Sequence, residues 1–255
     1  MKNPKAFLFL FIILALANTC SSQQAKRFKA LVLYETVGHH ILFSAAAKDW
    51  LNNLAVDSSF SVTYINNTNL VNDSLLRQYQ LIIQLDYPPY KWTDTAMAAF
   101  QNYIGQGWGG WIGLHHAGLL GEFDGYPMWQ WFSRFMGAIE FKNYIPSFAD
   151  GLVNVEDTLH PCMKGLPKKF IIKKEEWYTY NKSPRSKVKV LASVNESTYS
   201  PPSDIRMGDH PVVWSNVHYA AKNIYIFMGH SPELFTNNSY TTLFRNAIFW
   251  AASKP

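Results

Sequence analysis

Short apolar runs alternate with amphipathic stretches along the first half of the chain. Apolar residues recur every three or four positions from Phe43 to Leu54, which predicts one buried face of a helix. A second helix is predicted from Thr93, which suits an N-cap, to Gly105. The runs that predict buried strands cover residues 29–34, 60–65, 79–85 and 111–114. This order of strands and helices predicts a parallel sheet with right-handed crossovers.

The second half of the chain has a less regular pattern. An aromatic-rich helix is predicted over residues 126–137, and a closing helix over residues 240–252. The predicted strands cover residues 152–155, 170–174, 188–193, 212–214 and 224–228. Long loops are expected at residues 115–125, 142–150 and 195–210, and loops of this length often build a site.

The first residues have the pattern of a secretory leader. Two lysines precede an uncharged apolar run of about a dozen residues, which is too short for a stable membrane span. Cys20 resembles the lipid-modified cysteine of bacterial lipoproteins, although cleavage after Ala17 would also fit. The expected organisation is a signal peptide at 1–20, a tether at 21–27 and one domain at 28–255. This organisation predicts export to the periplasm or cell envelope, with a lipid on Cys20 as the only membrane attachment.

Composition and charge limit the classes of partner. The formal net charge is +5, and without the two leader lysines it falls to about +3, which argues against nucleic acid as the main partner. Apart from Cys20 the chain has one cysteine, Cys162, which excludes an internal disulfide and is interpreted as a packed core residue. Nine tryptophans and fourteen tyrosines supply a large core, and such rings can also stack on sugar faces.

The fourth apolar run ends in a turn of the kind that carries a nucleophile in some α/β enzymes. α/β-Hydrolases and class I glutamine amidotransferases place serine or cysteine in the middle of a five-residue frame bounded by glycines. The corresponding residues here run from Gly113 to Ala117, and the middle position is His115. Acyl transfer through a serine or cysteine at this turn is therefore not expected.

Histidines follow three of the predicted strands. His39 and His40 come after the first strand, His115 and His116 after the fourth, and His230 after the last. Carboxyl ends of parallel strands meet at one edge of a sheet, where ligands bind in open α/β folds. We therefore expect these side chains to converge, although any one histidine taken alone could serve only to hold a loop.

Six ordered blocks give the chain a resemblance to a known family. The blocks are Gly38-His39-His40, residues 109–117, His160-Pro161 with Gly165-Leu166-Pro167, residues 175–178, residues 208–214 and Phe227-Met228-Gly229-His230. Over nearly the whole mature chain, the sequence resembles the ThuA-like (trehalose utilisation) family of the class I glutamine amidotransferase-like superfamily. The resemblance implies an α/β three-layer sandwich with a mostly parallel, flavodoxin-like central sheet, and a role in disaccharide or keto-sugar metabolism. Ile41 and His116 depart from the family pattern, where an acidic residue and a serine are usual.

The residues of these blocks suggest acid–base chemistry. Histidine transfers protons near neutral pH, and a glutamate beside it can act as a base. The predicted catalytic residues are His40, His115, Glu176 and His230. The predicted substrate-binding residues are His39, His116, Tyr178, Trp177, His210 and Trp214, although His210 would also suit a turn that pins a loop.

A site of this kind could serve carbohydrate metabolism in more than one way. The leading hypothesis is an exported enzyme that cleaves or isomerises a disaccharide or 3-keto-glycoside, as a lyase, hydrolase or isomerase, and is not a glutamine amidotransferase. The alternative is a non-catalytic carbohydrate-binding or scaffolding protein on the same fold. A glycosidase that uses two carboxylates drawn from Glu122, Asp124 and Glu176 also stays open.

No cofactor is predicted, and a divalent metal is left open. Such a metal would take His40, His115 and His230 as ligands from separate loops, because the sequence contains no short H-E-x-x-H spacing. The expected partner is a small carbohydrate and not a nucleic acid. The pattern does not indicate an oligomeric state.

Overall fold

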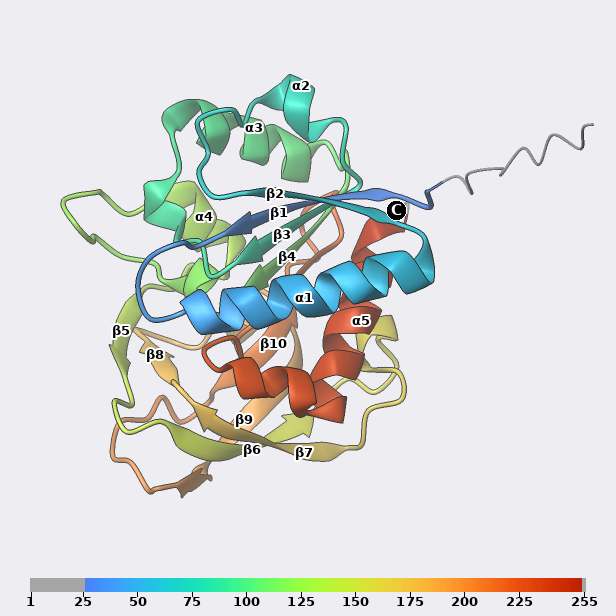
Figure 1. The fold of residues 1–255 in the computed structure, drawn as a ribbon. Coiled ribbons are helices and arrows are strands. Elements are labelled where there is room, and N and C mark those ends of the chain that lie inside the picture. Colours follow the sequence, from blue (N-terminus) through green and yellow to red (C-terminus); the bar gives the residue numbers. More distant parts are fainter. Residues whose placement is uncertain (1–25, 254–255) are drawn as a thin grey trace, which may run out of the picture.

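A nine-stranded mixed sheet runs through the molecule, with helices on both of its faces (Figure 1). The computed structural model describes residues 26–253, so the predicted leader, Cys20 and most of the predicted tether lie outside the described residues. Within residues 26–253, no helix combines the length and the apolar character that crossing a membrane requires.

Five parallel strands form the first half of the sheet, as the sequence predicts. In sheet order they are β2 (Ser61–Ile65), β1 (Lys29–Tyr34), β3 (Leu81–Leu85), β4 (Gly110–Leu114) and β11 (Asn223–Ile226). β3, β4 and β11 are buried along their whole length, because the layers on both sides leave no strand face for water. The carboxyl edge of this half is where the predicted histidines follow their strands.

Four antiparallel strands form the second half, so the prediction of a mostly parallel, flavodoxin-like sheet is wrong here. They are β10 (Pro211–Ser215), β9 (Lys189–Ser200), β6 (Ala149–Val155) and β7 (Lys169–Glu175). Loops, single 3₁₀ turns and the short strand β8 (Tyr178–Tyr180) connect them, whereas a parallel pair needs a crossover of a dozen or more residues, usually a helix. The fold is therefore α/β with a large mixed sheet.

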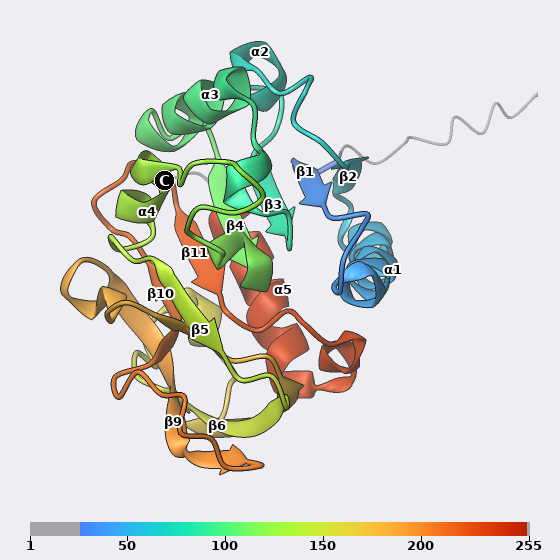
Figure 2. The ribbon, with the colours of Figure 1, turned by 90° about the vertical axis from the view of Figure 1, so that its left-hand side faces the viewer.

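Helices pack on both faces of the parallel half (Figure 2). α1 (Ile41–Ser58) and α5 (Asn238–Ala252) lie on one face, and α2 (Asp73–Leu76), α3 (Asp94–Gly105) and α4 (Gln130–Phe135) lie on the other. α4 is shorter than the predicted helix, because the backbone of Trp129 before it is extended and Gly137 after it has a φ of 107°. The Trp111 ring centroid lies 5.2 Å from that of Phe135 and 5.7 Å from that of Phe132, so many of the aromatic residues build the core between layers.

A two-stranded ribbon lies beside the carboxyl ends of the parallel strands. β5 (Phe141–Tyr144) pairs with β8 (Tyr178–Tyr180), on the side to which the arrowheads of β1 and β3 point (Figure 1). The sequence predicts a loop over residues 142–150 and no strand at β8, because three or four residues show too little alternation to indicate a strand. β9 likewise continues to Ser200, into the loop predicted over residues 195–210.

Candidate active site

The turn after β4 keeps the strained backbone of a nucleophile elbow. His115 has a φ angle of 37°, in the left-handed region that costs free energy for a residue with a side chain. The Tyr225 hydroxyl holds this turn by donating a hydrogen bond to the His115 carbonyl oxygen at 2.6 Å. The elbow is therefore preserved, and it presents an imidazole where hydrolases present a nucleophile.

The predicted histidines converge at the carboxyl edge of the sheet. The ring centroid of His40 lies 5.0 Å from that of His115, 4.9 Å from that of His230 and 4.6 Å from that of His116. The cause is the strand order, in which β1, β3, β4 and β11 are parallel neighbours and end at the same edge. The predicted convergence is confirmed, while the side chain of His39 stays exposed beside the cluster.

Glu176 lies at the centre of this group. Its Oε2 atom is 3.3 Å from His115 Nε2, 3.2 Å from His230 Nδ1 and 3.8 Å from His40 Nε2. Glu176 belongs to the segment between β7 and β8, which carries its carboxylate to the strand ends. The four predicted catalytic residues thus form one cluster, with one potential metal-ligating atom from each and all four atoms within 4.8 Å of one another.

A second carboxylate, Glu35, extends the cluster and is absent from the predicted set. Its Oε2 atom lies 3.3 Å from His40 Nδ1 and 3.2 Å from His116 Nδ1. Glu35 follows β1 directly, so the rule that selected His40, a polar residue after a buried strand, would have selected it too. Glu35, His40 and His116 form a second group whose atoms lie close enough to hold a metal ion.

Two further carboxyls, Asp86 and Glu175, are fully buried next to the histidines and are also absent from the predicted site. Asp86 accepts a hydrogen bond from the His116 backbone N–H at 3.3 Å. Glu175 accepts hydrogen bonds from the backbone N–H groups of Gly229 at 3.3 Å and His230 at 3.2 Å. Burial raises the pKa of each carboxyl to about 8, so both hold a proton at neutral pH.

Burial and hydrogen bonding separate the pKa values within the cluster. Burial lowers the pKa of His115 to about 3, so its imidazole is neutral. Burial also opposes charge on His40, but the Glu176 and Glu35 carboxylates, at 3.8 and 3.3 Å from its ring nitrogens, outweigh it and raise the pKa of His40 to about 10. Burial opposes ionisation of Glu176 as well, yet the surrounding rings of His115, His230 and His40 hold its pKa far below the usual range. A charged imidazole thus faces an ionised carboxylate, as expected of acid–base partners.

The raised pKa of Asp86 predicts a pH dependence of stability. The folded protein keeps this proton up to about pH 8, whereas the unfolded chain releases it near the ordinary pKa of 3.8. The contribution of Asp86 to wild-type stability is therefore full in acid and is lost as the pH rises through that window. Asp86→Asn mimics the neutral carboxyl, so its stability relative to wild type should rise by up to about 1.4 kcal/mol per pH unit across the window.

Urea unfolding of chelator-treated protein at several pH values measures this difference. Asparagine suits position 86, because the backbone φ there is 50°, a region that asparagine tolerates better than most residues. The same change at the exposed Asp204 controls for loss of a surface charge. A stability difference between Asp86→Asn and wild type that stays flat with pH would contradict a protonated Asp86.

The cluster opens into a cavity of about 240 Å³. Carboxylates and imidazoles line part of it, and the ribbon contributes the aromatic residues Phe141, Tyr144 and Tyr178. The Tyr178 ring centroid lies 4.5 Å from the His115 ring, and the Phe148 ring lies 4.5 Å from the His230 ring. Tyr144 is 41% exposed and Phe148 is 38% exposed. An aromatic wall with a few polar groups is typical of a small-molecule site.

Three predicted substrate-binding residues lie in the core instead, and this part of the prediction is corrected. Trp177 is fully buried and donates a hydrogen bond from Nε1 to the Ala149 carbonyl oxygen at 2.7 Å. It alternates with Glu176 and Tyr178 along an extended segment, so its side chain points to the opposite face. Trp214 is also buried. His210 Nδ1 lies 2.9 Å from Glu196 Oε1, which fits its other interpretation as a residue that pins a loop.

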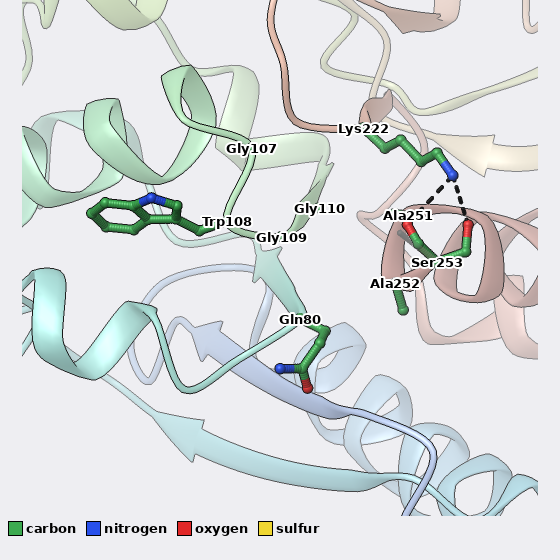
Figure 3. A pocket seen from close by; sticks show the side chains of 9 residues that line it. All are labelled: Gln80, Gly107, Trp108, Gly109, Gly110, Lys222, Ala251, Ala252 and Ser253. Atoms are coloured by element: carbon green, nitrogen blue, oxygen red, sulfur yellow. Dashed lines mark hydrogen bonds between the residues drawn. The ribbon is translucent and has the colours of Figure 1, made fainter. Parts of the chain in front are cut away.

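A separate cavity of about 310 Å³ lies at the opposite edge of the sheet (Figure 3). Gln80, Gly110 and Lys222 line it at the starts of β3, β4 and β11, and the end of α5 closes it. Lys222 Nζ donates a hydrogen bond to Ser253 Oγ at 2.7 Å. The predicted histidines lie at the other ends of these strands. The 240 Å³ cavity beside them, called the histidine cavity below, is therefore the candidate active site.

Comparison with known proteins places the chain in a family. The family model named Trehalose utilisation (ThuA) matches residues 29–251. The chain belongs to the ThuA family. A solved ThuA-like protein from Bacteroides uniformis ATCC 8492 is 32% identical, with a TM-score of 0.80 and coverage of 89% of this chain and 92% of that one. A ThuA-like protein from Parabacteroides merdae ATCC 43184 is 19% identical, with a TM-score of 0.66 and coverage of 89% and 91%.

The chain shares its fold with a glutaminase domain. The glutaminase domain of Trypanosoma brucei CTPS is 8% identical, with a TM-score of 0.50 and coverage of 89% of this chain and 97% of that chain, a likeness that shows the fold alone. No curated protein matches the sequence significantly. The resemblance drawn from the sequence blocks is confirmed, and ThuA membership points to a carbohydrate-related role.

Proposed function

We propose that this ThuA protein is an exported carbohydrate-processing enzyme that acts on a disaccharide or 3-keto-glycoside. The observation that carries the proposal is the charged His40 facing the ionised Glu176 in an aromatic-lined cavity. Family membership supports a sugar as the substrate. The leader pattern of residues 1–20, with Cys20 at its end, supports export and a lipid anchor.

A 3-keto-glycoside suits this pair because the hydrogen on its C2 lies beside a carbonyl and is acidic. In the proposed step, the Glu176 carboxylate takes the C2 proton, the C1–oxygen bond breaks, and His40 gives its proton to the leaving oxygen. The electron pair of the C2–H bond becomes the C1–C2 double bond, so no oxidant or reductant is consumed. Water that adds across this double bond completes a net hydrolysis.

Nucleophilic chemistry of the amidotransferase type has little support. His115 occupies the elbow, and Cys162 is buried, which raises the pKa of its thiol. The two-carboxylate glycosidase is also less well supported. Of its three candidate carboxylates Glu176 lines the histidine cavity, whereas Glu122 lines another cavity and Asp124 accepts a hydrogen bond from the Tyr90 hydroxyl at 3.4 Å.

A non-catalytic sugar-binding protein is the second candidate. The exposed rings of Tyr144 and Phe148 favour it, because aromatic faces beside a cavity can hold a sugar ring without any proton transfer. The two candidates differ in turnover. A binding protein retains a sugar unchanged, whereas the proposed enzyme releases a free sugar from a disaccharide.

The deciding experiment is a panel of native and 3-keto disaccharides, trehalose included, followed by NMR. We expect wild-type protein to release free sugar from a keto substrate, and His115→Ala to lower the rate by about 10²-fold, because the carboxylate loses one of its positioning groups. His218→Ala, at an exposed position, should match wild type. Binding without turnover would establish the second candidate, and ammonia release from glutamine would contradict both.

A further inference from the structure

Two buried imidazole nitrogens in the cluster point at Glu176 without a hydrogen bond. Among the described residues, His40 Nε2 and His230 Nδ1 have no hydrogen-bond partner, although they lie 3.8 and 3.2 Å from Glu176 Oε2. The His40 side chain is only 5% exposed, so water does not readily satisfy it. Buried polar atoms left in this way need an explanation, and an ion is one of the standard ones.

The tautomer of His115 leaves one ring nitrogen facing Glu176. Its Nδ1 lies 3.1 Å from the Phe227 carbonyl oxygen, which accepts only, so Nδ1 carries a hydrogen. Nε2 is then the ring nitrogen left to bind a metal, and it lies 3.3 Å from Glu176 Oε2. A cation between these two atoms makes a favourable contact with each.

His40 is oriented in the way that metal-binding histidines usually are. Its Nδ1 lies 3.3 Å from Glu35 Oε2, so the carboxylate accepts the Nδ1 hydrogen and leaves Nε2 directed at Glu176. A carboxylate behind a histidine fixes the tautomer and makes the other nitrogen a better ligand. The adjoining group of Glu35, His40 and His116 needs no ion, because the N–H groups of both rings satisfy Glu35.

The spacing of the four atoms fits a small divalent ion. With bonds of about 2.0–2.1 Å to nitrogen and oxygen, ligand atoms around a tetrahedral ion lie roughly 3.3–3.4 Å apart. Glu176 Oε2 lies 3.2–3.8 Å from the three nitrogens, and all four atoms lie within 4.8 Å of one another. Three imidazoles with one carboxylate favour zinc or a similar transition metal over magnesium or calcium.

We propose that His40 Nε2, His115 Nε2, His230 Nδ1 and Glu176 Oε2 bind one divalent transition-metal ion. Glu35 is a positioning residue that orients His40. The site does not rest on the proposed function. It competes with the acid–base step proposed above, because an ion on His40 Nε2 takes the place of the proton that His40 gives to the leaving oxygen. The metal-free protein is therefore the form that carries out that step.

The test is metal uptake by the full chain after chelator treatment. Cobalt(II) is titrated in and followed by visible absorption, and zinc is titrated in by calorimetry. We expect one equivalent to bind, and His115→Gln, His230→Gln and Glu176→Gln each to weaken binding by at least about 10- to 100-fold. His39→Gln is the matched control, because His39 is adjacent to His40 but lies outside the ligand group, and it should bind like wild type.

Circular dichroism establishes that each variant is folded before titration. No uptake by wild type, or equal uptake by His115→Gln and His39→Gln, overturns the site. Two equivalents overturn the assignment to a single ion. Metal binding by wild type, together with no turnover of any keto-sugar by the chelator-treated protein, leaves this site standing and removes the proposed function. Turnover of a keto-sugar by a protein that takes up no metal removes this site and leaves the proposed function standing.

Discussion

Replacing Glu176 with glutamine is expected to lower kcat/KM on a 3-keto-disaccharide by about 10²- to 10⁴-fold, the range that a positioned acid or base contributes. Glutamine keeps the shape of the side chain but cannot accept the C2 proton. It also removes the negative charge that, with Glu35, keeps His40 protonated, so the acid is weakened together with the base. Initial rates of free-sugar release at neutral pH measure this loss.

The matched control for this prediction is Glu122→Gln. It makes the same chemical change at an exposed carboxylate that lines a different cavity. We expect that variant to keep wild-type kcat/KM and wild-type stability. If Glu122→Gln loses activity and Glu176→Gln keeps it, the catalytic carboxylate lies outside the histidine cluster and the acid–base pair proposed here is wrong.

The parallel half of the fold could be predicted from the sequence, and the antiparallel half could not. Strands before residue 115 alternate with helical periods, and such a helical crossover fixes the direction of the next strand. Apolar runs locate β6, β7, β9 and β10, but the direction of these strands depends on the connections between them. Those connections carry no helical period, so the local pattern does not specify which strand pairs with which.

The histidines of the site could be predicted because each follows a strand, and the ends of parallel strands meet at one edge of the sheet. His115 directly follows β4 and His40 follows β1 after a short loop, and a single rule about strand ends selects both. Asp86 satisfies the same rule after β3, but an acidic residue in a turn is usually solvated, so its full burial was not evident from the sequence. Trp177 shows the converse, since its place in a motif predicts a ligand contact, but its side chain packs in the core.

Close packing against α5, and not a need for backbone flexibility, explains the glycine at position 110 before the elbow. α5 approaches β4 so closely that a Cβ placed on Gly110 would lie 2.1 Å from the carbonyl oxygen of Ala251. That oxygen belongs to the backbone of the helix, so it cannot rotate away as a side chain would. Because β4 leads directly into His115, the same contact that sets the distance between α5 and the sheet also supports the strand that carries the elbow.

Gly110→Ala is therefore expected to destabilise the protein by about 3 kcal/mol or more, the upper range for overpacking a core, which lowers Tm by roughly 6–12 °C in a domain of this size. Gly105→Ala is the matched control, because a Cβ there meets nothing within 4 Å at the end of α3. That variant should keep the wild-type Tm or exceed it slightly, since alanine loses less backbone entropy than glycine on folding. Thermal unfolding followed by circular dichroism compares the two. Equal midpoints would mean that α5 does not pack on β4 as closely as described, and the support for the elbow would have to lie elsewhere.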